Sequence, residues 1–218
     1  RWNTRPVFES DAPRLFESLS HLGPHRPYLL WVAGDVSFLD GTQVSMVGTR
    51  NPSQEGLENA SKMVRLLGAP IVSGGAIGID AEAHRAALAA GLPTAAFMAG
   101  GIDRAYPQEN WELFHEIVRR GGAMISELAP GTAPTRFRFL QRNRLIAAAS
   151  SETYVIEAGF RSGSRNTAGH ARNLGRKVFA LAESASSGCR YMIKTGLAKP
   201  FHLNRENGGH LSLMRFRD

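Results

Sequence analysis

Four arginines and two phenylalanines are crowded into one short stretch of the chain, Arg136-Phe-Arg-Phe-Leu-Gln-Arg-Asn-Arg144. Guanidinium groups neutralise phosphates, and aromatic rings give bases a flat surface on which to stack. This combination is typical of proteins that bind single-stranded nucleic acids. The alternative is that the phenylalanines are core residues and that the arginines form a solvated face.

Small residues follow several apolar, β-prone segments, where a bare backbone can approach an anion. They occur at Gly48-Thr-Arg50, Ser73-Gly-Gly-Ala-Ile-Gly78, Gly100-Gly101 and Ser162-Gly-Ser164. Backbone N–H groups in such loops bind phosphate well, and the N-terminus of a following helix adds a favourable dipole. A single loop of this kind can equally be a tight turn. Several loops at one edge of a sheet predict a composite phosphate-binding surface.

Residues suited to catalysis are sparse. Four carboxylates follow apolar segments and could line one cleft: Asp80, Asp103, Glu127 and Glu157. Asp80 is well placed to cap a helix that begins at Ala81, and His84 lies one turn later, so we expect a structural pair. The chain has no H-E-x-x-H motif, no paired cysteines and no nucleophile–base pattern. We therefore expect no catalytic residue, no metal and no cofactor.

Two common nucleotide-binding motifs fit the sequence poorly. The stretch from Ser73 to Gly78 resembles G-x-G-x-x-G, with Ser in the first place. However, Met98 is followed by Ala-Gly-Gly, so the acidic residue expected after the next strand is missing. The P-loop pattern G-x-x-x-x-G-K-[ST] is absent. These observations argue against both a dinucleotide site and ATP hydrolysis.

Short β-prone segments alternate with segments of helical spacing. Strands are expected at Tyr28–Val32, Val44–Val47, Pro70–Ser73, Thr94–Met98, Ala123–Ser126, Thr153–Ile156 and Lys177–Leu181. Helices are expected at Ser53–Leu67, Ala81–Ala90, Glu109–Arg119, Arg142–Ala149 and Thr167–Leu174. Glycine stands where a left-handed residue would end four of these helices, at Gly68, Gly91, Gly121 and Gly175. The alternation predicts an α/β fold with a mainly parallel sheet and helices on both faces.

The length and composition favour one large domain. Hydrophobic residues make up 43% of the 218 residues, enough for a sizeable core. We expect a Rossmann-like domain over residues 28–203, preceded by a short, partly helical lead-in (1–27) and followed by a polar tail (204–218). No apolar stretch is long enough to span a membrane, and the first residues lack the apolar centre of a secretion signal. A single cysteine suits a reducing compartment, so we expect a cytoplasmic protein.

The charges are distributed unevenly along the chain. Residues 1–118 contain 9 Lys and Arg against 13 Asp and Glu, whereas residues 119–218 contain 17 against 6. Of those 17 later cations, 14 are arginine, whose planar group suits phosphate and stacks on bases. This asymmetry favours a polyanionic partner over a merely basic surface.

Several motifs together resemble the DNA-processing protein A family, also called Smf. They include Ser45-Met-Val-Gly-Thr-Arg50, Ser73-Gly-Gly-Ala-Ile-Gly-Ile-Asp80, Ala83-His-Arg85, Gly101-Ile-Asp103, Tyr106-Pro107, Ser126-Glu127, Phe139-Leu-Gln-Arg-Asn-Arg144, Glu157-Ala158, Ser162-Gly-Ser164 and Thr167-Ala168. Their order and spacing agree from about Pro27 to Gly196. Because several independent motifs occur in sequence, the resemblance is more specific than one glycine loop.

The resemblance implies an extended Rossmann fold that binds single-stranded DNA, protects it and helps to load RecA during natural transformation. It also implies a homodimer. Arg50 would hold a phosphate, Phe139 or Phe137 would stack on a base, and Asn143 would fix the local backbone. The predicted nucleic-acid-binding residues are Arg50, Ser73, Gly74, Gly75, Gly78, Arg138, Phe139, Arg142, Asn143, Arg144, Ser162, Gly163, Ser164 and Arg165. Asp80 and His84 are predicted to be structural.

The sequence leaves two other functions open. Nucleotide phosphoribohydrolases share this kind of sheet, but they carry a Pro-Gly-Gly-x-Gly-Thr loop followed by a catalytic Glu. Here the corresponding stretch reads Gly159-Phe-Arg-Ser-Gly-Ser-Arg-Asn-Thr167, without the Pro and without a Glu after it. The other alternative is a nucleotide-sensing module, for which we expect mononucleotide binding that survives high salt.

Overall fold

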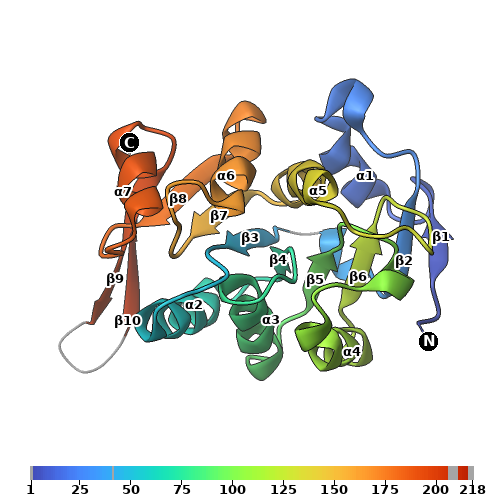
Figure 1. The fold of residues 1–218 in the computed structure, drawn as a ribbon, viewed down its shortest axis with the longest axis horizontal. Coiled ribbons are helices and arrows are strands. Elements are labelled where there is room, and N and C mark those ends of the chain that lie inside the picture. The colour runs from blue at the N-terminus through green and yellow to red at the C-terminus, as the bar shows by residue number, and fades with distance from the viewer. Residues whose placement is uncertain (1, 41, 206–210, 216–218) are drawn as a thin grey trace.

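The computed structural model describes residues 2–40, 42–205 and 211–215. These residues form one sheet of ten strands in the order β1-β2-β6-β5-β4-β3-β7-β8-β9-β10 (Figure 1). The strands are β1 (Arg5–Val7), β2 (Leu30–Gly34), β3 (Val44–Val47), β4 (Ile71–Ser73), β5 (Thr94–Phe97), β6 (Ala123–Ser126), β7 (Glu152–Val155), β8 (Lys177–Leu181), β9 (Lys199–Arg205) and β10 (Leu211–Arg215). Seven neighbouring strands of this sheet, β6-β5-β4-β3-β7-β8-β9, are parallel to one another. Antiparallel pairs join β1 to β2, β2 to β6 and β9 to β10.

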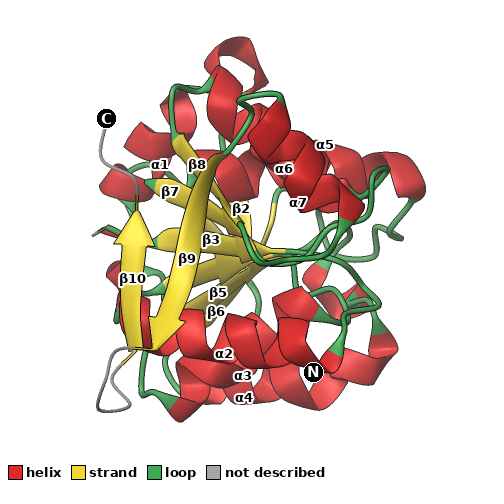
Figure 2. Cartoon of the chain, turned by 90° about the vertical axis from the view of Figure 1, so that its left-hand side faces the viewer, coloured by secondary structure: helices red, strands yellow, loops and turns green. Residues whose placement is uncertain are grey.

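Helices cover both faces of the sheet, as predicted for a parallel sheet (Figure 2). The helices are α1 (Pro13–Ser20), α2 (Gln54–Leu67), α3 (Ile79–Ala89), α4 (Trp111–Arg119), α5 (Arg136–Ala148), α6 (Gly163–Asn173) and α7 (Ser187–Lys194). Both views place α1, α5, α6 and α7 on one face and α2, α3 and α4 on the other. Leu145 and Met192 belong to the core under the first group, and Met63 and Phe114 to the cores under the second. The predicted α/β fold is confirmed.

Three predicted strands, at 44–47, 123–126 and 177–181, have the bounds found in the structure. Two helices begin earlier than predicted, α5 at Arg136 instead of Arg142 and α6 at Gly163 instead of Thr167. The first turn of α5 is capped by Thr135, whose hydroxyl accepts a hydrogen bond from the Arg138 backbone N–H at 3.3 Å. That first turn is largely exposed, so the spacing of apolar residues does not reveal it.

The expected lead-in and polar tail both take part in the sheet. In the lead-in, α1 was expected, but β1 was missed. The expected tail is partly wrong, because β9 reaches Arg205 and β10 pairs with it in a hairpin. The two-residue period of Leu211-Ser-Leu213 is too short to identify a strand without its partner. Helix α7 was also missed, and residues 206–210 and 216–218 of the expected tail lie outside the described residues.

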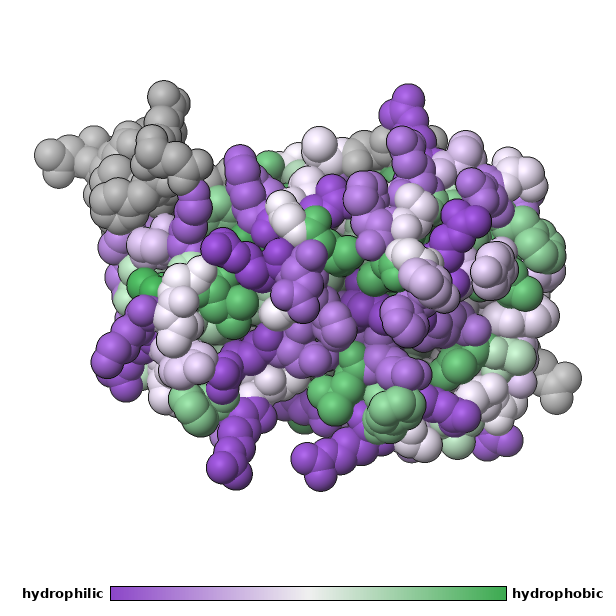
Figure 3. All heavy atoms as spheres, turned by 90° about the horizontal axis from the view of Figure 1, so that it is seen from above, coloured by the Kyte–Doolittle hydropathy of each residue, from purple (hydrophilic) through white to green (hydrophobic). Residues whose placement is uncertain are grey.

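The face that carries α1, α5, α6 and α7 is mostly hydrophilic, with small, separate hydrophobic patches (Figure 3). Within the described residues, no helix combines the length and the apolar character needed to cross a membrane.

Candidate functional site

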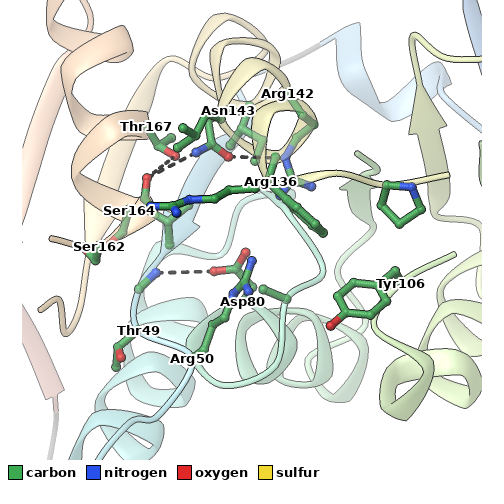
Figure 4. A pocket seen from close by; sticks show the side chains of 18 of the residues that line it. Thr49, Arg50, Asp80, Tyr106, Arg136, Arg142, Asn143, Ser162, Ser164 and Thr167 are labelled. Atoms are coloured by element: carbon green, nitrogen blue, oxygen red, sulfur yellow. Dashed lines mark hydrogen bonds between the residues drawn. The ribbon is translucent and has the colours of Figure 1, made fainter. Parts of the chain in front are cut away.

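A cleft of about 760 Å³ lies at the carboxyl ends of β3 and β7 (Figure 4). Its walls are the loop after β3 (47–50), one side of α5 and the turn that leads into α6 (161–164). Tyr106, from the loop after β5, completes the opposite side. The cleft is therefore at the edge of the sheet where ligands of parallel α/β proteins bind.

Arg50 and Phe139 meet inside this cleft. The Arg50 Cζ atom lies 5.1 Å from the centre of the Phe139 ring, within the range of a cation–π contact. The Tyr106 ring contacts Phe139 edge-on, with 5.8 Å between ring centres. An aromatic surface and an exposed positive charge thus lie side by side, although 89 positions separate Arg50 from Phe139 in the sequence.

Two further arginines, Arg136 and Arg161, are exposed and line the cleft. Among the described residues, neither they nor Arg50 has a carboxylate partner. In Figure 4, Arg136 comes from α5 and Arg50 from the loop after β3, on opposite sides of the cleft. Three unpaired guanidinium groups therefore face a common space.

The N-terminus of α6 also opens into the cleft. Ser162 is its N-cap residue, but no side chain caps the first backbone N–H groups of this helix. The Ser162 and Ser164 hydroxyls bond to each other at 2.7 Å, and the Asn143 side chain donates to Gly163 O at 3.2 Å. Free amides and the helix dipole make this end of α6 suited to an anion. Asn143 fixes the start of α6 against α5, which is the role the resemblance implied.

Arg142 lines the bottom of the cleft but is buried, with an exposed fraction of only 5%. Its Nη1 donates to Gly74 O at 2.8 Å and also to Phe97 O, and its Nε donates to the Asn143 side chain at 3.3 Å. Burial lowers the pKa of the guanidinium to about 10, opposed by the Asp80 carboxylate. The group therefore stays charged at neutral pH and is engaged mainly with the protein itself.

Asp80 lies in the first turn of α3, at the floor of the cleft. Its Oδ2 accepts a hydrogen bond from Gly74 N at 3.2 Å and its Oδ1 one from Gly48 N at 3.4 Å. Burial raises the pKa of this carboxyl, although the nearby Arg142 acts in the opposite direction. The predicted N-cap role is wrong, because the helix begins at Ile79 and its N-cap is Gly78. Asp80 instead ties together the loops that follow β3 and β4.

The predicted pair between Asp80 and His84 does not form. The His84 Nδ1 atom bonds to Thr94 Oγ1 at 2.7 Å, and the Thr94 hydroxyl donates to Ile71 O at 2.8 Å. Since that hydroxyl proton is already used, His84 must donate from Nδ1, so its neutral ring is protonated there. Full burial lowers the pKa of His84 to about 3. The side chain points to the sheet, where Thr94 is the first residue of β5.

The structure does not bring Ser73, Gly74 or Gly75 to the surface of the cleft. The Ser73 hydroxyl is buried and donates to Met46 O at 2.6 Å. A Cβ atom on Gly74 would lie 2.6 Å from Arg142 Nη2, and one on Gly75 would lie 2.7 Å from the Phe114 ring. Gly78, with φ of +83°, passes close to the Thr49 backbone. These glycines serve close packing of protein against protein.

Arg138, Arg144 and Arg165 lie outside the lining of the cleft. Arg144 forms two hydrogen bonds with the Glu127 carboxylate, at 2.8 and 2.6 Å. Arg165 lies over the Tyr191 ring at 4.2 Å, and Arg138 donates to the Ala133 backbone carbonyl in the loop before α5. Because consecutive helix positions are about 100° apart, α5 directs its arginines to several sides.

The four carboxylates that could have shared one cleft are separated, and only Asp80 lines it. Asp103 accepts from Gly131 N at 2.8 Å, and Glu127 is paired with Arg144. Glu157 accepts from the Ser53 hydroxyl at 2.8 Å and so holds the start of α2. Each of these three carboxylates stabilises a local contact of the fold and is not part of the cleft.

Sequence reasoning missed several residues that line the cleft, among them two exposed arginines and one tyrosine. Arg136 stood in the basic stretch and Arg161 directly before Ser162, but neither was among the predicted binding residues. Their exposure on the cleft side depends on where α5 and α6 begin. Tyr106 comes from a loop with no periodic pattern, and no signal pointed to its contact with Phe139.

A family model described as "DNA recombination-mediator protein A" matches residues 7–207. This chain belongs to that family. Among curated members, DNA processing protein DprA of Streptococcus pneumoniae is 38% identical over 176 residues, which are 78% of this chain and 62% of that protein. The chain spans from 46% to 62% of the length of the curated relatives that it matches.

Two solved structures of DprA proteins have the same fold. The X-ray structure of DprA from S. pneumoniae has a TM-score of 0.82 and 35% identity, and covers 91% of this chain and 71% of that one. The second structure is of DNA processing protein A from Helicobacter pylori and describes its single-stranded DNA binding mode. It has a TM-score of 0.80 and 28% identity to this chain. It covers 92% of this chain and 91% of the other. The predicted membership of the DprA/Smf family is confirmed.

Proposed function

We propose that this protein binds single-stranded DNA in the cleft at the carboxyl edge of its sheet. The observation that carries the proposal is the contact between Arg50 and Phe139, beside the uncapped N-terminus of α6. A partly exposed aromatic ring with a neighbouring guanidinium is the arrangement on which an unpaired base stacks. Family membership supports the proposal, as does the similarity to the H. pylori protein, whose solved structure is described for its single-stranded DNA binding mode.

The cleft favours a single strand over a duplex for a geometric reason. Phe139 is half-buried between Arg50 and Tyr106, so a base must leave its own stack to reach the ring. The bases of a duplex are already stacked and paired, and extracting one costs a few kcal/mol. A single strand avoids most of that cost.

Phosphates are held by two kinds of group in this proposal. Arg50, Arg136 and Arg161 supply charge, and the first N–H groups of α6 supply hydrogen bonds along the helix dipole. These contacts carry no base information, so we expect little sequence preference.

For the cellular role, we propose a recombination mediator that protects incoming single-stranded DNA and helps to load RecA in natural transformation. We propose that it acts as a homodimer in the cytoplasm and has no catalytic activity. Family membership and the family model's description support this role. The separation of the carboxylates that follow the strands also fits binding better than hydrolysis.

Fluorescence anisotropy with a labelled oligothymidylate and a matching duplex tests the proposal at low and high salt. We expect preference for the single strand, steep weakening with salt and a clear loss in Arg50→Ala. Arg65→Ala is the matched control, because it removes one exposed arginine from the last turn of α2, far from the carboxyl edge. Equal binding of both DNA forms, or equal effects of the two variants, would contradict the proposal. Mononucleotide binding that persists at high salt would favour a nucleotide-sensing module instead.

A further inference from the structure

A second cavity, of about 330 Å³, lies on the other side of α5 from the cleft. It is lined by the segments that follow β5 and β6 and, on α5, by Phe137, Arg138 and Gln141. Phe137 and Phe139 are two positions apart on the helix, so their side chains point about 200° apart around its axis. Phe139 faces the cleft, whereas Phe137 faces the second cavity. Arg142 lines both, which makes the two cavities neighbours.

Phe137 and Tyr28 are the two most exposed large hydrophobic residues of the described chain, at 66% and 77%. Tyr28 precedes β2, which runs antiparallel to β6 with Trp31 opposite Ser126. The segment that enters β2 therefore lies beside the segment that leaves β6, at the same edge of the sheet as both cavities. Exposed aromatic faces in contact with water are suited to a ligand that itself has flat faces.

The charges around the second cavity also fit a nucleic acid. Arg138 lies in its wall, and the Arg26 Cζ atom lies 5.7 Å from the Tyr28 ring centre. Glu127, the acidic residue of the wall, is paired with Arg144 at 2.6 Å, so its charge is balanced. Arg136, at the first position of α5, is exposed between the two cavities.

We propose that the second cavity takes a further unstacked nucleotide of the same single strand, with its base on the Phe137 ring. The strand leaves the cleft across the first turn of α5, with Arg136 holding the phosphate at the crossing and Tyr28 as the next stacking surface. The cavity is near the lower end of small-ligand sites, about 300–1,000 Å³, which suits one base. Continuity with the cleft through Arg142 and the balanced acidic charge favour DNA over a protein partner. This inference rests on the proposed function and extends the same binding site.

Oligothymidylates of two lengths separate the two sites, one of about four nucleotides and one of about sixteen, the limits of common single-strand site sizes. We expect Phe137→Ala to weaken the longer strand about tenfold and the shorter one less than twofold, since only the longer strand reaches past α5. Phe137→Trp keeps an aromatic face and should restore the affinity. Phe139→Ala should weaken both lengths. Phe160→Ala is the matched control, because Phe160 is 49% exposed but lies on the far side of the cleft, against Arg165.

Thermal unfolding of each variant shows whether the fold is retained, as we expect for Phe137→Ala because the side chain is mostly exposed. If Phe139→Ala weakens both lengths while Phe137→Ala weakens neither, the second subsite is wrong but the proposed function stands. If Phe137→Ala weakens both lengths equally, Phe137 belongs to the first site and the inference is overturned. If only Phe160→Ala loses affinity in a length-dependent way, the strand runs past α6 and the inference is overturned. If neither Phe139→Ala nor Arg50→Ala affects either length, the proposed function itself fails.

Discussion

Arg142 and Asp80 are joined through the backbone of one residue, because Arg142 Nη1 donates to Gly74 O at 2.8 Å while Asp80 Oδ2 accepts from Gly74 N at 3.2 Å. Both side chains are buried beneath the cleft. The opposite charges hold the loop after β4 between them, and Asp80 also reaches Gly48 N in the loop after β3. The floor of the cleft is therefore an internal network, above which exposed side chains are free to bind a ligand.

This network predicts a structural role for Arg142. Arg142→Met leaves Asp80 without its counter-charge and two backbone carbonyls without a donor, so we expect a loss of about 3–5 kcal/mol in unfolding free energy. Asp80→Asn should cost less, about 1–3 kcal/mol, because one amide oxygen can still accept a hydrogen bond. Urea unfolding measures both. If Arg142→Met unfolds like the unchanged protein but no longer binds DNA, Arg142 contacts the ligand directly.

Gly74 should tolerate no side chain. In Gly74→Ala the new Cβ would lie 2.6 Å from Arg142 Nη2 and 2.8 Å from Asp80 Oδ2, so the network must shift. We expect a clear fall in melting temperature. Gly163→Ala is the control, since its nearest neighbour would be 3.9 Å away and its φ is not positive. Similar melting temperatures for both variants would show that the side chains of Arg142 and Asp80 can shift at little cost in stability.

His84 predicts a pH dependence of stability. Its pKa falls from 6.5 to about 3 on folding, so the neutral ring stabilises the fold fully above pH 6.5. As pH falls toward 3, the unfolded chain takes up a proton that the folded chain does not, and stability is lost at up to about 1.4 kcal/mol per pH unit. Asp80, whose pKa is raised, contributes with the opposite sign at low pH.

Comparison with His84→Gln isolates this contribution, because the amide can still donate to Thr94 but does not titrate. Urea midpoints between pH 7 and pH 4 should fall more steeply for the unchanged protein than for the variant. Parallel curves would mean that His84 is not the titrating group.

The exposed arginines of the cleft and the arginine outside it, Arg165, should differ in their effect on the salt dependence of DNA binding. Loss of one phosphate contact to a single strand lowers the slope of log affinity against log salt by about 0.7. We expect this change for Arg50→Ala, Arg136→Ala and Arg161→Ala, whose side chains are exposed in the cleft. Arg165→Ala should leave the slope nearly unchanged, because Arg165 stacks on Tyr191 outside the cleft. A full change in slope for Arg165→Ala would extend the binding path to α7.

Phe139 should contribute through its ring. Phe139→Ala is expected to weaken binding of an oligothymidylate by about 1–3 kcal/mol, the usual loss when a base–aromatic stack is removed. Phe139→Tyr keeps the face of the ring and should retain most of the affinity. Isothermal titration calorimetry measures both. Equal losses in the two variants would indicate that Phe139 shapes the cleft without stacking on a base.

The sequence determined the architecture because its signals are local. Alternating strand and helix segments predicted the parallel sheet, and Gly68, Gly91, Gly121 and Gly175 each adopt the positive φ expected of a residue that ends a helix. The order of motifs was enough to identify the family. The position of the cleft also followed, since ligands gather at the carboxyl edge of such sheets.

Only the tertiary structure decided which arginine serves which purpose. In the sequence, Arg136 and Arg142 belong to one basic stretch, but the helix directs the first to the mouth of the cleft and buries the second on its floor. Burial obliges a guanidinium to bond to the protein, whereas exposure leaves its donors for a ligand. Arg50 became the partner of Phe139 only when β3 and α5 were brought together at one edge. Contacts between segments so far apart depend on the packing of the whole sheet, which no local pattern records.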